Sequence, residues 1–120
     1  MTYWGYHLLL DCSGCDLNQI TDKNNIRSFV KDLVESIDMV AINDTWIERT
    51  AIGDITKEGF SMYQLLVTSN ISAQFIDEPR HIYLDVFSCK SFDVDTVKDC
   101  VNKYFTPKKI RTNFVTRNAD

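Results

Sequence analysis

The chain has 120 residues, of which 44% are hydrophobic and 25% charged, a balance typical of a folded globular domain. Its 17 acidic and 13 basic residues give a net charge of −4, which repels polyanions and argues against a nucleic-acid partner. Apolar runs reach only about three residues, whereas a membrane-spanning helix needs about 20. We therefore expect one domain over residues 1–120, with no membrane and no nucleic-acid partner.

The first half of the chain alternates between strand and helix patterns. The aromatic and aliphatic stretch Tyr3–Cys12 predicts a buried strand, followed by a turn and then a loop up to residue 21. Apolar residues recur every three or four positions between residues 22 and 38, which predicts an amphipathic helix capped by Thr21 or Asp22. Residues 39–50 have a strand composition interrupted at Asn43-Asp44, and an exposed loop follows.

The second half predicts a run of strands and one more helix. Residues 60–68, 71–76 and 81–89 are rich in β-forming residues, with Ser69-Asn70 between the first two stretches. Asp93 caps a second amphipathic helix that Pro107 ends. Alternating residues from 110 to 116 then predict a last strand.

This order, β-α-β-β-β-β-α-β, favours an α+β fold: a two-layer sandwich of a mainly antiparallel sheet with two helices on one face. The other face also needs cover, and Trp46, Tyr63 and Tyr83 lie on strands that can supply apolar surface there. We therefore predict a homodimer with four layers in the order α/β/β/α. The segments 7–11 and 81–85 share His-x-x-Leu-Asp at a separation of 74 residues, which indicates an internal β-α-β-β type duplication.

The four cysteines occur without a secretory signal, which predicts free thiols and a cytoplasmic location. Cys12 and Cys15 have the spacing of half a zinc site, but Cys89 and Cys100 are eleven residues apart with no histidine between them. We therefore expect no metal, and we interpret Cys100, on the apolar stripe of the second helix, as a packing residue.

The common catalytic motifs, such as glycine-rich phosphate loops and serine nucleophile elbows, are absent from the sequence. His7 and His81 begin strands without a metal-ligand neighbour, and we interpret both as structural. The remaining candidate is Ser69, which lies between two short strands where backbone strain can be stored. A hydroxyl in such a turn can attack its own preceding carbonyl.

Three sequence blocks share the pattern of one protein family. Gly5–Asp16 is similar to an opening His-Leu-Leu strand with a Gly-Cys-Asp turn, Gly59-Phe-Ser61 to a second block, and Asp85–Cys89 to a third. Together they resemble the small bacterial and archaeal S-adenosylmethionine decarboxylases over most of the chain, with a longer loop at residues 50–58. The resemblance implies decarboxylation of S-adenosylmethionine for polyamine (spermidine) biosynthesis.

The resemblance also implies roles for individual residues. In this family the serine that corresponds to Ser69 attacks the peptide bond after Thr68, and the resulting ester eliminates to a new amino-terminal pyruvoyl cofactor. The carbonyl of that cofactor serves as an electron sink when the substrate loses CO₂. By the same resemblance, Cys89 returns a proton to the product, Ser61 assists the processing reaction, and Glu78 holds the ribose hydroxyls of the substrate.

The chain departs from the family pattern around this turn. The family has Glu-Ser-His where this chain has residues 68–70, Thr-Ser-Asn. Its processing histidine falls at Gln74, on the substrate side of the site, and an aromatic residue near the substrate falls at Ile76. The Gln74 amide does not titrate and cannot act as the base for ester elimination, a role worth about 10² to 10⁴ in rate. We therefore expect cleavage between Thr68 and Ser69 to be very slow or absent in the isolated protein.

Two other functions fit these departures. A non-processing homologue would act as a regulatory subunit of a true decarboxylase or as a small-molecule binding protein. Loss of the aromatic residue at Ile76 instead favours a related pyruvoyl decarboxylase of a basic amino acid such as ornithine or arginine. The leading interpretation is a homodimeric S-adenosylmethionine decarboxylase.

Overall fold

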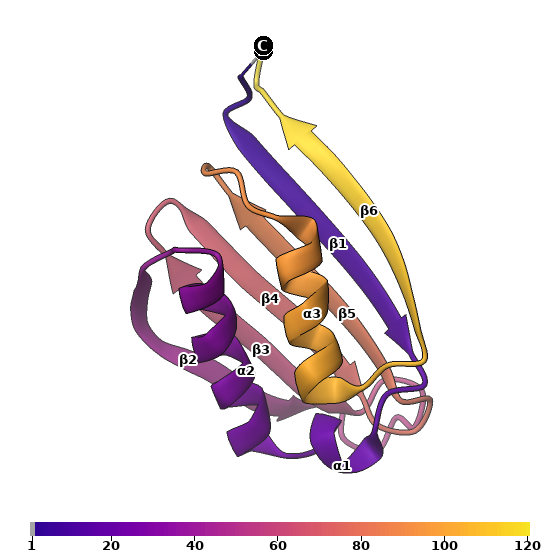
Figure 1. Ribbon diagram of the computed structural model, residues 1–120. Helices are drawn as coiled ribbons and strands as arrows, with labels where there is room; N and C mark the ends of the chain where they lie inside the picture. The colour runs from indigo at the N-terminus through magenta and orange to yellow at the C-terminus, as the bar shows by residue number, and fades with distance from the viewer. Residues whose placement is uncertain (1) are drawn as a thin grey trace.

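The computed structural model describes residues 2–120, in which one sheet is packed against helices. Figure 1 shows two longer helices lying side by side over one face of the sheet, with a short helix at its lower end. The elements are β1 (Gly5–Ser13), α1 (Leu17–Ile20), α2 (Lys23–Ser36), β2 (Ala41–Thr50), β3 (Gly59–Leu66), β4 (Ser69–Ile76), β5 (His81–Ser88), α3 (Val94–Phe105) and β6 (Lys109–Arg117).

The sheet has the order β2-β3-β4-β5-β1-β6, and every neighbouring pair is antiparallel. The four strands from β2 to β5 form a meander, while β1 and β6 extend the sheet on the other side of β5. The predicted α+β class, with a largely antiparallel sheet and helices on one face, is confirmed.

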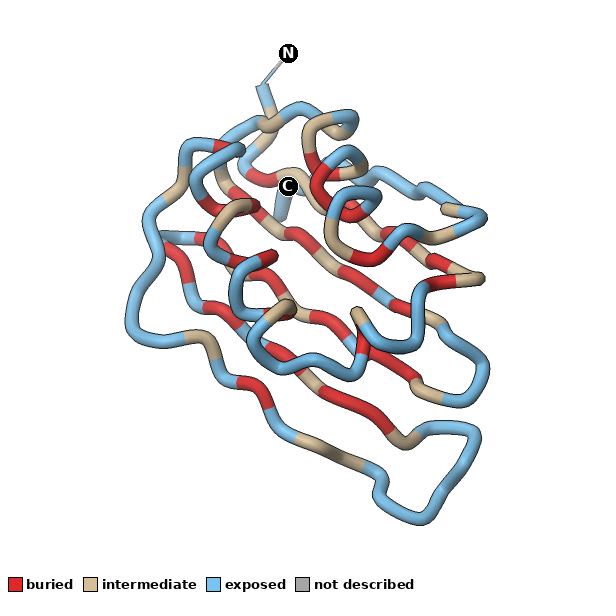
Figure 2. Tube along the Cα trace, turned by 60° about the horizontal axis from the view of Figure 1, so that its bottom comes forward, coloured by how far each residue is buried: buried red, intermediate tan, exposed pale blue. Residues whose placement is uncertain are grey.

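The core lies between the sheet and the helices. Alternate strand residues such as Leu8, Ile71 and Phe75 are buried there against Phe29 of α2 and Phe105 of α3. Figure 2 shows this alternation as red segments repeated along the inner strands of the sheet, β1, β3, β4 and β5. The intervening residues form the other face of the sheet, which we call the open face. As predicted, large side chains lie exposed on it: Trp46, Tyr63 and Tyr83.

Aspartate caps begin all three helices. Asp22 accepts hydrogen bonds from the amides of Asn24 and Asn25 at the start of α2, and Asp93 caps α3 in the same way. The expectation of a loop before α2 was wrong, because α1 forms there. Its cap, Asp16, accepts from the Gln19 amide, and burial of Ile20 against the core fixes the single turn.

The expected break at Asn43-Asp44 is a bulge within one continuous strand, β2. The β2–β3 register shifts between Ile42 and Trp46, and Asn43 has a φ of 64°. The buried side chain of Gln64 occupies this bulge, donating to the carbonyls of Ile42 and Asn43 and accepting from the Thr45 hydroxyl. A buried amide therefore satisfies the backbone groups that the irregular edge would leave unpaired.

The two repeat segments become neighbouring strands. In the β1–β5 pair, Leu10 lies directly opposite Leu84, its equivalent in the repeat. That pairing is expected when two copies are related by a local twofold axis between the strands. Each strand is followed by helical structure and then by a strand at an opposite edge of the sheet, as Figure 1 shows for β2 and β6.

Candidate functional site

The Thr68–Ser69 bond lies at the tight connection between β3 and β4. Leu66 pairs with Ser69, so only Val67 and Thr68 form the turn. Thr68 has a φ of 56°, in the left-handed region that a β-branched residue rarely occupies and that costs roughly 1–2 kcal/mol. The Val67 amide donates to the Val40 carbonyl at 3.0 Å, which ties the turn to the segment before β2. The predicted strain is therefore present in the backbone of Thr68, the residue before the Thr68–Ser69 bond.

Ser69 begins β4 with its side chain on the helix-covered side of the sheet. It is 7% exposed and lies in the same row as the buried residues Ile71, Ala73 and Phe75. On the neighbouring strand it pairs with Ser88, which is fully buried. The nucleophile of the predicted reaction is thus shielded from bulk water while the preceding residue, Thr68, is exposed.

Cys89 follows β5 and contacts the same turn. Its Sγ lies 2.7 Å from Thr68 Oγ1, and that hydroxyl donates its single proton to the Val67 carbonyl at 2.7 Å. Because the Thr68 hydroxyl proton already forms the bond to the Val67 carbonyl, the Cys89 thiol is the donor in its contact with Thr68 Oγ1. The structure therefore brings together Thr68, Ser69 and Cys89, as expected from the sequence.

Ser61 and Gln74 form a second group on the open face. Ser61 Oγ donates to Gln74 Oε1 at 2.5 Å, and the Thr50 hydroxyl lies 2.7 Å from Ser61 Oγ. Because the amide oxygen only accepts, Ser61 donates to Gln74 and Thr50 donates to Ser61. Thr50 was not among the residues predicted for the site, since a threonine at the end of a strand gives no sequence signal of its own.

Glu78 lies beyond the far end of β4, next to an ion-pair cluster. Arg49 contacts Asp77 at 2.7 Å and Glu58 at 3.2 Å. Glu78, Asp77 and Glu58 line a small hollow of about 130 Å³ together with Gly53 and Ile55. Glu78 is exposed there, available to a ligand that approaches from outside.

The predicted site residues therefore fall into two groups at opposite ends of β4. Gln74 lies five positions after Ser69, which corresponds to roughly 17 Å along an extended strand. Glu78 lies still farther along the chain. Within one chain, then, Gln74 does not reach the Thr68–Ser69 bond, and the sequence spacing alone gave no indication of this separation.

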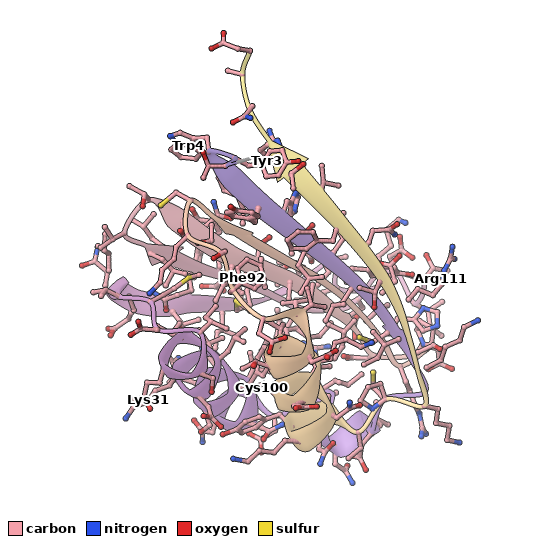
Figure 3. All side chains as sticks on the ribbon, turned by 45° about the horizontal axis from the view of Figure 1, so that its top comes forward. Tyr3, Trp4, Lys31, Phe92, Cys100 and Arg111 are labelled. Atoms are coloured by element: carbon pink, nitrogen blue, oxygen red, sulfur yellow. The ribbon has the colours of Figure 1, made fainter. Side chains whose placement is uncertain are left out.

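The sequence gave no indication of a groove that lies near the β3–β4 turn. It has a volume of about 630 Å³ and is lined by Trp4, Phe87 and Arg117 together with the last three residues. Trp4 stacks on Phe87 with ring centroids 6.0 Å apart, and the Arg117 guanidinium lies 5.3 Å from the Phe87 centroid. Figure 3 shows Trp4 where β1 begins, beside the C-terminal tail. Phe87 pairs with Asn70, the residue after Ser69, which places one wall of the groove on the strand next to the turn.

Gly5 lies in close contact with the Phe87 ring. A Cβ there would lie 3.0 Å from Phe87 Cε1, so a larger residue would require the ring to shift slightly. A Trp immediately before Gly5 is the signal that would have indicated the groove from the sequence.

The three remaining thiols are buried, whereas Cys89 is partly exposed. Burial raises the pKa of Cys12 to about 12 and that of Cys15 to about 11, and it raises the pKa of Cys100 to about 12. All four cysteines are free. No cluster of potential metal ligands occurs among residues 2–120, and none of the helices described there is long and apolar enough to cross a membrane.

Comparison with known proteins identifies the family of this chain. A family model described as S-adenosylmethionine decarboxylase matches residues 6–118. The S-adenosylmethionine decarboxylase proenzyme of Clostridium botulinum strain Hall is 28% identical over 118 residues, covering 98% of this chain and 97% of that protein. The proenzyme of strain Loch Maree is 32% identical over 94 residues, covering 78% and 76% of the two chains.

A solved structure shares the fold. The adenosylmethionine decarboxylase from Aquifex aeolicus VF5 superposes with a TM-score of 0.81 at 21% identity, covering 100% of this chain and 95% of that one. Because the family model spans nearly the whole chain and two proenzymes align with it, this chain belongs to the S-adenosylmethionine decarboxylase family.

Proposed function

We propose that the protein decarboxylates S-adenosylmethionine for spermidine biosynthesis, after slow self-cleavage between Thr68 and Ser69. The observation that carries this proposal is the strained Thr68, whose backbone precedes a buried serine and whose hydroxyl contacts Cys89. Nucleophile, strained bond and proton donor thus meet at one turn, where a self-processing decarboxylase needs them.

The residues at this turn fit a pyruvoyl group derived from Ser69. Ser69 is the first residue of β4, so a break before it would leave a new amino terminus held by pairing with Ser88. When formed, such a group supplies the electron sink for loss of CO₂. Cys89 holds its thiol proton beside this position, and in the proposed reaction it delivers that proton to the product.

The groove next to the turn suits the adenosyl part of the substrate. The Trp4 and Phe87 rings offer an aromatic surface on which a purine can stack, and offset stacking of this kind is worth about 0.5–1.5 kcal/mol beyond area burial. We assign this groove to the base and expect Trp4 to replace the aromatic contact missing at Ile76.

A second copy completes the proposed site. Ser61, Gln74 and Glu78 are too far from Ser69 to act within one chain, and the open face carries exposed aromatic residues that need cover. In our proposal, two open faces pack together and place these three residues of one copy near the Thr68–Ser69 turn of the other. We also expect the protein in the cytoplasm, in keeping with its four free thiols.

The test is CO₂ release from carboxyl-labelled S-adenosylmethionine, ornithine and arginine by aged protein and by Gln74→His, with Ser69→Ala as the control. We expect release from S-adenosylmethionine alone, faster in Gln74→His, and none from Ser69→Ala. Release from arginine or ornithine alone would assign the chain to the basic amino-acid class. Binding of S-adenosylmethionine without release by either protein would identify a non-processing binder.

A further inference from the structure

Three connections between elements meet at the end of the sheet where Cys89 lies. They are the segment between α2 and β2, the β3–β4 turn and the segment that follows β5. The Val67 amide of the turn donates to the Val40 carbonyl before β2 at 3.0 Å. The Cys89 thiol donates to Thr68 Oγ1 of the same turn at 2.7 Å. The turn is therefore bonded to both of the other connections.

Lys90 joins those two connections to each other. Its ammonium group donates to the backbone carbonyl of Asp38 at 2.9 Å and to the Asp38 carboxylate at 2.8 Å. The amide of Lys90 donates to the hydroxyl of the buried Ser88 at 2.9 Å, so the backbone is also held on both sides of Cys89. With this link, the contacts form a closed ring through all three connections.

Asp38 is held in place by the end of α2. It directly follows the C-cap residue Ile37 and has a φ of 55°, and its amide donates to the Glu35 carbonyl at 3.1 Å. Within α2, all of which the structure describes, the last turn holds no basic residue, although a cation is favoured at a helix C-terminus. Lys90 supplies that cation from another part of the chain. Its hydrogen bond and then its charge lower the pKa of Asp38 below the ordinary value of 3.8.

The Lys90–Asp38 ion pair lies at the surface, where such a pair adds little to the stability of the whole chain. Its local effect follows from its place beside Cys89 in the sequence. We propose that Lys90 is a positioning residue, whose contacts with Asp38 hold the segment after β5 so that the Cys89 thiol stays against Thr68. This inference rests on the proposed function for the role of Cys89 as proton donor, whereas the ring of contacts can be measured without turnover.

Amide hydrogen exchange, followed at each residue by NMR, tests the ring. Lys90→Met removes the ammonium group and keeps most of the side-chain length. We expect the Val67 and Lys90-position amides to exchange about threefold faster in this variant, the scale of an exposed ion pair, because exchange reports local opening. Lys31→Met, which alters an exposed lysine of α2, is the matched control and should exchange like the parent. Unchanged exchange at both amides in Lys90→Met overturns the proposal, whatever the protein catalyses.

Turnover tests the positioning role in protein that releases CO₂. Lys90→Met should lower kcat by at least about threefold with KM unchanged, because a less precisely held proton donor slows the reaction without altering substrate binding. Lys90→Arg keeps a cation and should restore both kcat and slow exchange, and circular dichroism should show that each variant is folded. Parent kcat in Lys90→Met, even with faster exchange, overturns the proposal. Absence of CO₂ release from all proteins, Gln74→His included, refutes the proposed function, and exchange then decides the ring.

Discussion

Cys89 is partly exposed whereas the other three cysteines are buried, and alkylation can measure this difference. The raised pKa values of Cys12, Cys15 and Cys100 keep those buried thiols protonated below about pH 11, and the thiolate is the reactive form. We predict that iodoacetamide at pH 8 alkylates Cys89 alone in the native protein, identified by peptide mass mapping. Rapid labelling of any buried cysteine would contradict the environments described above.

Catalysis should depend on the same thiol. In protein that releases CO₂, Cys89→Ala should lower the rate by roughly 10²-fold or more, the usual effect of removing a general acid. Cys100→Ala, which removes a packing thiol beside the Phe29 carbonyl, is the matched control and should retain the rate. Unchanged activity in Cys89→Ala, with loss in Cys100→Ala, would reverse the assignment.

Gly59 has a structural role that its place in the Gly59-Phe-Ser61 block did not reveal. A Cβ at this position would lie 1.6 Å from the Phe75 carbonyl oxygen, so β3 and the end of β4 could not approach as they do. We predict that Gly59→Ala lowers the free energy of unfolding by about 3 kcal/mol in urea titrations. Gly53→Ala, in open space with a φ of 96°, should cost only about 1 kcal/mol. Equal effects would rule out the steric explanation.

Asp32 of α2 links the two long helices. Its carboxylate accepts from Lys103 at 3.1 Å and from the Tyr104 hydroxyl at 3.0 Å, both on α3. The hydrogen bond from Lys103, followed by that from Tyr104, lowers the pKa of Asp32 below its ordinary value of 3.8. A lowered pKa means that the folded state favours the ionised carboxylate, so the stabilisation exists above the ordinary pKa and disappears as the pH falls through the folded one.

We therefore predict that Asp32→Asn lowers Tm near neutral pH and that its difference from the parent shrinks toward zero as the pH falls to about 2. Asp99→Asn, which removes an exposed charge from α3 without changing the Asp32 contacts, is the control. Thermal melts followed by circular dichroism across this range provide the measurement. A difference that stays constant with pH would show that the link is not electrostatic.

Helices were predictable from the sequence where apolar residues recur with the helical period of three to four positions. The stripe of apolar residues in α2 and the caps at Asp22 and Asp93 gave those helices almost to the residue. Two features were not predictable. The single turn of α1 depends on tertiary burial of Ile20, and continuity of β2 through Asn43 depends on Gln64, which is 21 residues away in the sequence.

The exposed aromatic residues of the open face predict a homodimer. Light scattering at micromolar concentration should give about 28 kDa, twice the 13.9 kDa mass of the chain. Tyr83→Lys, which puts a charge on the open face, should shift the protein to monomer, whereas Glu35→Lys on the exposed side of α2 should not. A parent that scatters as a 13.9 kDa particle would contradict the shared site.

The site was predictable only in part, for a reason of geometry. The Ser69–Cys89 spacing placed both residues at one end of neighbouring strands, because the β4–β5 hairpin returns the chain to where it began. The pairing of Ser61 with Gln74 across β3 and β4, and the distance of both from Ser69, became visible only with the register. The groove at Trp4 and Phe87 joins residues 83 positions apart, beyond the reach of any local pattern.

In our proposal, the Thr68–Ser69 bond is competent for self-cleavage and lacks only a base. The intact-mass spectrum of freshly purified and aged Gln74→His, with the parent measured alongside, is the decisive test. We predict the full-length mass in the fresh parent, and in Gln74→His two fragments, residues 1–68 and residues 69–120, the second blocked by a pyruvoyl group. A Gln74→His protein that is folded and dimeric but keeps only the full-length mass would show that the turn itself does not support cleavage.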